Sequence, residues 1–328
     1  MARSAPPNLQ SVDLADRFRV FATYEARGSS ELYEKLALSA AEDAELLALL
    51  EPLSPRQKQP NLLFGVVNFL GGIDEPYEAF RTFVLDRADE IVSLLQTKRT
   101  QTNEVRRCTA LLPAVSLVDG PVSLVEVGTS AGLNLLMDRY AYDYGDAGRV
   151  GESELLLSAE ARGPVPVPKR LPDVVFRKGI DIAPVDVRSD DELRWLEACV
   201  WPDQTERLAT LRAAVDIARV DPPPIVRGDL VEEIEGVLDE APSDATTVVF
   251  HSAVLGYLSD DRKAAFAEIM AKRDVVWLSN EGGGVIGGVR WTQRPPPPEI
   301  CFYLGRAGAE LLAYAHPHGR WVEWVGGN

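Results

Sequence analysis

The chain has 328 residues, of which 46% are hydrophobic and 26% are charged. These proportions are typical of a soluble globular protein with one large domain or two unequal ones. Its formal net charge is −16, and only seven of its 34 basic residues are lysine. Because such a surface repels nucleic acid and anionic lipid, we expect neither as a partner. The three cysteines are scattered, so we expect no disulfide framework, and with only three cysteines and three histidines we expect no metal site.

No apolar run reaches the roughly 18–20 residues that a membrane span needs. The first residues, Met-Ala-Arg-Ser-Ala-Pro-Pro, lack the apolar stretch of a secretory signal, so we expect a cytoplasmic protein. The acid excess has two interpretations, a cytoplasm kept at high salt or simply an acidic protein. Unfolding at low salt would support the halophilic interpretation, and indifference to salt would contradict it.

The first hundred residues have a helical pattern. Leu14, Phe18, Phe21 and Tyr24 recur at helical spacing, and a second helix is expected to begin near Ser30. Further helices are predicted over residues 40–50, 61–70, 76–95 and 104–112. Residues 1–115 are therefore predicted to form a helical N-terminal cap domain.

From residue 116 the pattern changes to short β-rich runs separated by helical stretches. Strands are predicted over residues 123–127, 174–180, 225–227, 246–250 and 275–279. This alternation favours the α/β class, with a Rossmann-like, doubly wound and mostly parallel sheet over residues 116–328. Near the end, strands over 299–304 and 320–325 flank a predicted helix over 307–314, and an antiparallel strand is expected to close the sheet.

Residues 122–132, Val-Ser-Leu-Val-Glu-Val-Gly-Thr-Ser-Ala-Gly, predict a strand, a tight turn and a helix. Read as Gly128-x-Ser130-x-Gly132, the motif is that of a serine-hydrolase nucleophile elbow. That interpretation is weakened because the elements before the motif are helical and no His-Gly-Gly-Gly motif is present. Partners for Ser130 in the required order do exist among Asp181, Asp229, His251, His316 and His318.

Read from Glu126 through Gly128, Ser130 and Gly132, the same stretch predicts a ligand-binding turn after the first strand of the sheet. The glycines would let the backbone approach a ligand, and the following helix offers N–H groups. Without a lysine after the turn a P-loop is excluded, and Glu126 would repel a pyrophosphate. A cofactor with a cationic amino-acid tail and a ribose fits better, and S-adenosylmethionine is one.

Two more acids are predicted at strand ends. Asp181 is placed to accept hydrogen bonds from ribose hydroxyls, and Asp229 lies where an adenine amino group is expected. The pattern resembles class I S-adenosylmethionine-dependent methyltransferases over residues 120–328. One departure is that Asp181 follows Gly128 by 53 residues, where about 20 is usual. An insertion over residues 145–171 explains the gap, unless Asp143 or Asp146 binds the ribose.

Several stretches also resemble domain-of-unknown-function family 2332 of prokaryotes, a resemblance that covers nearly the whole chain. It implies a shared fold and pocket but no reaction. The stretches are Gln-Thr-Asn-Glu-Val-Arg-Arg-Cys at 101–108, Ser-Ala-Gly-Leu-Asn-Leu-Leu-Met-Asp-Arg-Tyr at 130–140, Gly-Ile-Asp-Ile-Ala-Pro at 179–184, Trp-Leu-Glu at 195–197, Trp-Pro at 201–202 and Ser-Asn-Glu at 279–281.

Other residues are candidates for binding the substrate or for catalysis. His251, at the end of a predicted strand, is the candidate general base, or else a loop residue that caps a helix. Asn280 and Glu281 could bind polar groups of the substrate or shape the turn that follows them. Arg107 could bind a carboxylate or form an interdomain salt bridge.

Trp195 and Trp201 lie six residues apart, a spacing that suggests packing. They could instead form an aromatic wall for a ligand.

The main hypothesis is methyl transfer from S-adenosylmethionine to a small molecule. The alternatives are a hydrolase with Ser130 as nucleophile and a nucleoside-binding protein without catalytic activity. Cofactor binding that weakens in Asp181→Ala would support the first hypothesis.

Overall fold

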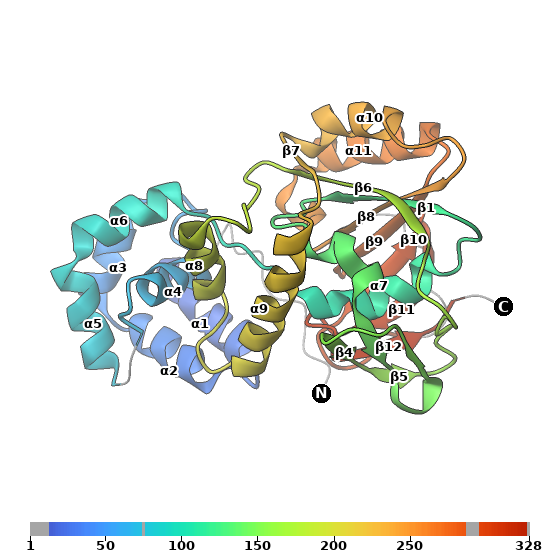
Figure 1. Cartoon of the computed structure of the whole chain (residues 1–328). Coiled ribbons are helices and arrows are strands. Elements are labelled where there is room, and N and C mark those ends of the chain that lie inside the picture. The colour runs from blue at the N-terminus through green and yellow to red at the C-terminus, as the bar shows by residue number, and fades with distance from the viewer. Residues whose placement is uncertain (1–12, 74–75, 287–294, 327–328) are drawn as a thin grey trace. The chain divides into compact units, whose positions relative to one another are not determined.

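The computed structural model describes residues 13–73, 76–286 and 295–326, and within them the chain forms two compact units (Figure 1). The helical unit holds the described residues up to 102 together with Arg188–Ala209, and the sheet unit holds Asn103–Val187 and the residues from Thr210 onward. The sequence pattern placed a single boundary near residue 115. Arg188–Ala209 lies instead in the helical unit because Trp195 and Trp201 are buried in its apolar core.

The helical unit confirms the helical pattern of the first hundred residues. The second helix begins where Ser30 Oγ accepts a hydrogen bond from the Tyr33 backbone N–H. The helix predicted over residues 76–95 is divided at Arg87, whose φ of −118° and ψ of 27° are not helical. The elements are α1 (Leu14–Val20), the π-helical turn η2 (Phe21–Ala26), α2 (Glu31–Ala40), α3 (Ala44–Leu50), α4 (Pro60–Phe69), α5 (Tyr77–Asp86), α6 (Ala88–Thr97), α8 (Asp190–Ala198) and the start of α9 (Thr205–Val220).

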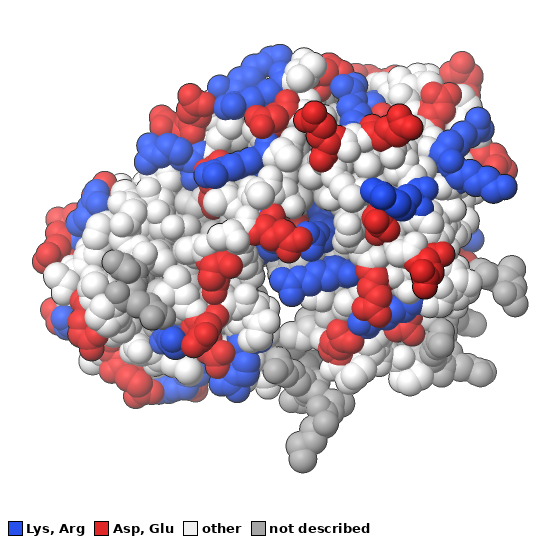
Figure 2. Space-filling model, turned by 60° about the horizontal axis from the view of Figure 1, so that its bottom comes forward, with Lys and Arg blue, Asp and Glu red and all other residues white. Residues whose placement is uncertain are grey.

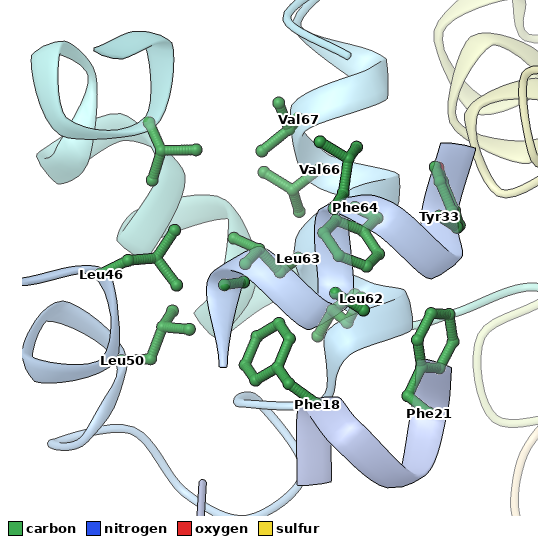
Figure 3. Packing of buried hydrophobic residues seen from close by; sticks show 14 of the residues in the cluster. Phe18, Phe21, Tyr33, Leu46, Leu50, Leu62, Leu63, Phe64, Val66 and Val67 are labelled. Atoms are coloured by element: carbon green, nitrogen blue, oxygen red, sulfur yellow. The ribbon is translucent and has the colours of Figure 1, made fainter. Parts of the chain in front are cut away.

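Phe64 lies at the centre of the core of this unit, as Figure 3 shows. Its ring is 4.8 Å from the ring of Tyr33 and between 5.7 and 6.2 Å from those of Phe18, Phe21 and Phe80, measured between ring centroids. Such tilted and edge-on contacts are the favourable geometries for aromatic pairs. Aromatic packing is therefore a principal stabilising feature of the helical unit.

The sheet unit contains, within the described residues, a nine-stranded sheet in the order β5-β12-β11-β10-β9-β8-β1-β6-β7. The five strands predicted from the β-rich runs are all present, each within about three residues of the expected bounds. Strands of the sheet are β1 (Val122–Val127), β5 (Glu160–Arg162), β6 (Val174–Asp181), β7 (Ile225–Arg227), β8 (Thr246–Ser252), β9 (Val276–Gly282), β10 (Phe302–Arg306), β11 (Glu310–Ala315) and β12 (Trp321–Trp324).

Five strands, β7, β6, β1, β8 and β9, are mutually parallel. After β1, the chain places β6 and then β7 on one side of β1, and afterwards β8 and then β9 on its other side. The direction in which successive strands follow across the sheet therefore reverses between β1 and β8. We call the edge at which these strands end the carboxyl edge. In open α/β sheets ligands bind at such a reversal point, outside the carboxyl ends of the strands.

The C-terminal part of the sheet is an antiparallel meander of β9, β10, β11 and β12. The prediction of a helix over residues 307–314 is wrong, because this stretch is a turn followed by β11. Its Ala-Glu-Leu-Leu-Ala composition favours a helix, but Leu311 through Ala315 are all buried within the sheet. Tertiary packing therefore overrides the local preference.

Helices cover both faces of the sheet (Figure 1). On one face Val125, Val127 and Val249 pack against α10 (Leu230–Asp239) and α11 (Asp260–Lys272). The other face carries α7 (Cys108–Val115), which directly follows the short 3-10 helix η3 (Val105–Arg107). A second 3-10 helix, η4 (Leu133–Arg139), follows β1 and contacts α7. No helix among the described residues is long and apolar enough to cross a membrane.

The predicted insertion over residues 145–171 has regular structure of its own. It contains the 3-10 turn η5 (Gly145–Ala147), β3 (Arg149–Val150), β4 (Leu156–Ser158) and the sheet-edge strand β5, while β2 (Ala141–Asp143) pairs with β3 and β4 in a small separate sheet. On the face shown in Figure 2 acidic and basic side chains are interspersed, so the negative net charge does not form one uniform patch there.

Candidate functional site

Polar side chains gather at the carboxyl edge on both faces of the sheet. Side chains alternate along a strand, so Glu126, Ser252 and Asn280 lie on the face of α7, while His251 and Glu281 lie on the face of α10 and α11. All five are buried. Buried polar groups are costly unless they are hydrogen-bonded, so their partners indicate what each can do.

The turn after β1 is held in a strained conformation. Ser130 has a φ of 53°, in the left-handed region that is unfavourable for residues other than glycine. Its backbone N–H donates to Asp181 Oδ2 over 2.8 Å, and its Oγ accepts a hydrogen bond from Asn103 Nδ2 over 2.7 Å. Asn103 Oδ1 also accepts from the Ala131 N–H. Strain of this kind persists where surrounding contacts enforce it and is common at functional sites.

The end of β8 is strained as well, at Ala253 with a φ of 58°. The two strained residues therefore follow the two neighbouring strands between which the strand order reverses. The next residue, Val254, packs over the first turn, because a Cβ on Gly128 would lie 2.3 Å from its Cγ2. A Cβ on Gly132 would lie 2.5 Å from Pro223. We expected both glycines to admit a ligand, but in this structure side chains of the protein itself occupy the space beside them.

Glu126 is the most deeply buried acid of the turn. Its Oε2 accepts a hydrogen bond from Thr129 Oγ1 over 2.5 Å, and its Oε1 accepts one from Asn134 Nδ2 over 3.1 Å. Burial raises the pKa of Glu126 to about 8, although these hydrogen bonds lower it, as does the nearby charge of Arg107. The carboxyl group therefore holds a proton in the folded protein near neutral pH.

Replacing Glu126 by glutamine should flatten the pH dependence of stability. Because the pKa of Glu126 is raised from 4.5 to about 8 on folding, its contribution is fully present below pH 4.5 and is lost as the pH rises through about 8. Within this window the wild type should lose about 1.4 kcal/mol per pH unit through this group, and Glu126→Gln should not. Urea unfolding between pH 5 and 8 measures both slopes, with the exposed Glu268→Gln as a control. Parallel slopes for wild type and Glu126→Gln would contradict the prediction.

His251 is fully buried, with both ring nitrogens engaged. Its Nδ1 is 2.7 Å from Glu281 Oε1, and its Nε2 accepts a hydrogen bond from Trp277 Nε1 over 3.0 Å. An indole N–H can only donate, so Nε2 is the unprotonated nitrogen and Nδ1 donates to the carboxylate. To accept a proton from a substrate, the ring would first have to leave Trp277. This arrangement fits a positioning role better than the general-base role expected from the sequence.

Glu281 anchors the segment after β8. Besides His251, its Oε1 accepts hydrogen bonds from the backbone N–H groups of Val254 and Leu255. It therefore links the ends of β8 and β9 and holds Val254 over the first turn.

Asn280 contains the unpaired polar atom of the site. Its Nδ2 donates to Ser252 Oγ over 3.0 Å, whereas its Oδ1 is buried and has no hydrogen-bond partner. A buried acceptor without a partner costs about 1–3 kcal/mol. Such a group calls for a specific explanation, of which a ligand that donates to it is one.

Arg107 ties three parts of the chain together. Its Nε donates to the Pro317 carbonyl over 2.9 Å, its Nη1 donates to the Ser252 carbonyl over 3.2 Å, and its guanidinium lies over the ring of Phe302. One guanidinium therefore reaches the end of β8 and the loop after β11, which brings these two ends together. Whether it also binds a substrate carboxylate stays a prediction.

The other acids predicted from the sequence have partners within the protein. The oxygens of Asp181 accept from the backbone N–H groups of Ser130 and Ala183, so it holds the turn after β1. Asp229 begins α10 by accepting from the Val231 N–H, and it pairs with Arg262. Asp143 lies in β2, in the small sheet, and pairs with Arg149.

Four residues that shape the site have no local sequence signal for their roles: Asn103, Glu104, Asn134 and Val254. Asn103 bonds to the turn after β1, and Glu104 Oε2 is 2.9 Å from His318 Nδ1. Their partners lie 27 and 214 residues away in the chain, so no local pattern could reveal them.

Comparison with known protein families gives one match. The profile of the family described as "Uncharacterized protein conserved in bacteria (DUF2332)" matches residues 15–324. The chain belongs to this family. None of the curated proteins compared with the chain matches it.

The DUF2332 resemblance rested on separate stretches of sequence, and most of them meet at the carboxyl edge. Residues 101–108 supply Asn103, Glu104 and Arg107, residues 130–140 supply Ser130 and Asn134, residues 179–184 supply Asp181, and residues 279–281 supply Asn280 and Glu281. The tryptophans at 195 and 201 lie in the core of the helical unit instead.

Proposed function

We propose that the carboxyl edge of the sheet unit binds S-adenosylmethionine and that the protein transfers its methyl group to a small molecule. The observation that carries this proposal is the buried Oδ1 of Asn280, an acceptor without a hydrogen-bond partner at the carboxyl edge. Carboxyl oxygens of Glu126 and Asp181 also lie at this edge, where they accept hydrogen bonds from the protein itself.

These acceptors match the chemistry of the cofactor. S-adenosylmethionine offers an ammonium group, ribose hydroxyls and an adenine amino group as donors, and it carries a positive sulfonium. A cation near Glu126 would favour the ionised form of that carboxyl, whereas a pyrophosphate would disfavour it further. The order of the parallel strands, 3-2-1-4-5 counted along the sheet from β7 to β9, is also that of doubly wound nucleotide-binding sheets.

Within this proposal the residues of the chain bind and orient. Asn280 would accept a hydrogen bond from the cofactor, and Asp181 would hold the turn after β1 in its strained shape. His251 and Glu281 would fix Val254 and the end of β8. When bound, the cofactor supplies an activated methyl group, and the contribution of the protein is to align it with the acceptor.

Calorimetry with S-adenosylmethionine and the variant Asn280→Leu tests the proposal. We expect the wild type to bind and the variant to bind about tenfold more weakly or worse, because one hydrogen bond to a donor of the ligand is lost. Asn280→Leu removes a buried acceptor that has no partner but also the hydrogen bond to Ser252 Oγ, so denaturant unfolding should show that the variant is folded. This variant is more informative than Asp181→Ala, which would also release the turn.

Asp229→Asn is the matched control. Asparagine retains an oxygen that can cap α10, and Asp229 already has partners in the protein, so affinity should be unchanged. No binding by the wild type would refute the proposal. A loss of affinity in Asp229→Asn would restore the adenine-binding role expected from the sequence.

The serine-hydrolase hypothesis has one observation in its favour, since a strained residue after a strand is a feature of nucleophile elbows. Ser130 is such a residue, but it is buried, and its Oγ accepts a hydrogen bond from Asn103. Labelling of Ser130 by a fluorophosphonate probe would favour hydrolysis. Binding without turnover across a broad acceptor panel would favour a nucleoside-binding protein without catalytic activity.

A further inference from the structure

A second histidine–carboxylate pair, Glu104 and His318, lies at the carboxyl edge. His318 Nδ1 is 2.9 Å from Glu104 Oε2, and Glu104 is buried whereas the His318 side chain is 24% exposed. A carboxylate bonded to Nδ1 keeps the proton on that nitrogen and makes Nε2 the basic one. The pair therefore has the geometry of a histidine oriented to accept a proton.

The loop that carries His318 is held firmly in place. The His318 backbone N–H donates to His316 Nδ1, the Gly319 N–H donates to the His316 carbonyl, and the Gly319 carbonyl accepts from Thr109 Oγ1. Burial lowers the pKa of His316 to about 4, and the nearby His318 and Arg320 add to the effect. His316 is therefore neutral near pH 7 and serves as a fixed acceptor for the loop.

The topology places this pair beside the reversal point of the sheet. Strand β11 runs in the same direction as β9, because both are antiparallel to β10, so its end at Ala315 reaches the carboxyl edge. Arg107 joins this loop to the end of β8 through the Pro317 and Ser252 carbonyls. Asn103, the neighbour of Glu104, bonds to the turn after β1. The pair thus lies beside both strained turns.

We infer that His318, oriented by Glu104, accepts a proton from the substrate at this site, so the methyl acceptor is a small molecule that reacts through a hydroxyl or amine. The inference rests on the proposed function. In this step the O–H or N–H bond of the substrate breaks, its electron pair stays on the oxygen or nitrogen, and the proton bonds to Nε2 of His318. The Glu104 carboxylate stabilises the resulting imidazolium.

Nitrogen-15 NMR of the imidazole rings tests the inference without needing the acceptor, and the chain has only three histidines to assign. Glu104 and His316 contact His318 directly. Other charged groups of this region include Arg107, which bonds to Pro317, Arg106, which lies beside Gly319, and Arg320 and Glu299, which lie near His316. Glu104→Gln should lower the titration midpoint of His318 by about one pH unit. The half-exposed Glu310→Gln should leave it unchanged.

The deciding comparison uses S-adenosylmethionine and S-adenosylhomocysteine, which differ in the methyl group and the sulfonium charge. The sulfonium charge of bound S-adenosylmethionine should lower the His318 midpoint by about half a unit or more relative to the neutral thioether. Equal midpoints with both ligands bound would overturn the inference and leave the proposed function standing. An unchanged midpoint in Glu104→Gln would also overturn it. If calorimetry shows that neither ligand binds, the proposed function fails, and the role of His318 in methyl transfer fails with it.

Discussion

Replacing Phe64 by alanine should lower the free energy of unfolding of the helical unit by about 3–5 kcal/mol. The side chain is fully buried and lies against four aromatic rings, which cannot all move inward to fill the space left behind. The loss therefore combines the transfer free energy of the ring with the cost of a cavity. Denaturant unfolding measures it, and hydrogen exchange of α1, α2 and α4 assigns it to this unit.

Two further substitutions define the origin of the effect. Phe64→Leu fills most of the volume and should cost less than Phe64→Ala. Leu38→Ala truncates a side chain in α2 that is exposed, and it should change stability by no more than about 0.5 kcal/mol. If Phe64→Ala cost no more than Leu38→Ala, the aromatic cluster could not be a principal source of stability.

Replacing Gly319 by alanine should destabilise the sheet unit by about 3 kcal/mol or more. Gly319 has a φ of 65°, which costs a residue with a Cβ about 1–2 kcal/mol. The new Cβ would also lie 2.1 Å from the carbonyl oxygen of Arg106. That atom belongs to the backbone and cannot move aside as a flexible side chain would, so overpacking adds a further 1–3 kcal/mol, roughly.

Gly120→Ala separates the two contributions. Gly120 has a φ of 80°, but a Cβ there would meet nothing within 4 Å, so only the backbone cost of about 1–2 kcal/mol remains. The difference between the two variants in denaturant unfolding measures the overlap with Arg106. Equal losses would show that the loop of His318 does not pack tightly on η3. The same displacement should weaken the Glu104–His318 contact, which the NMR titration reports.

Most strands were predictable from the sequence because their information is local. Runs such as Val-Ser-Leu-Val-Glu-Val before Gly128 combine β-branched residues with a turn that stops them. One exception, β11, has the composition of a helix, and only its neighbours β10 and β12 make it a strand. The predicted extent of the helical unit was wrong for a similar reason, since Trp195 and Trp201 pack on residues more than a hundred positions earlier in the chain.

The sequence predicted that several candidate residues lie at strand ends, but not which contacts they make. Glu126 and Asp181 do lie together at the carboxyl edge, because parallel strands end together. The sequence could not show whether an acid faces a ligand or a backbone N–H, as the partners of Asp181 illustrate. Nor could it show that Trp277 occupies the second nitrogen of His251. Such contacts depend on the register between strands, which is set only when the whole sheet forms.

The separation along the chain between the partners at the carboxyl edge also has a consequence for biosynthesis. Arg107 and Pro317 are 210 residues apart, and Glu104 and His318 are 214 residues apart. Contacts between such distant segments form late, because a long loop must close before they contribute stability. During translation the helical elements and the first strand can emerge and begin to fold. The carboxyl edge can be completed only after the hairpin of β11 and β12 has left the ribosome. A nascent chain that ends before residue 316 thus lacks the histidine loop, and its Arg107 and Glu104 lack their native partners there.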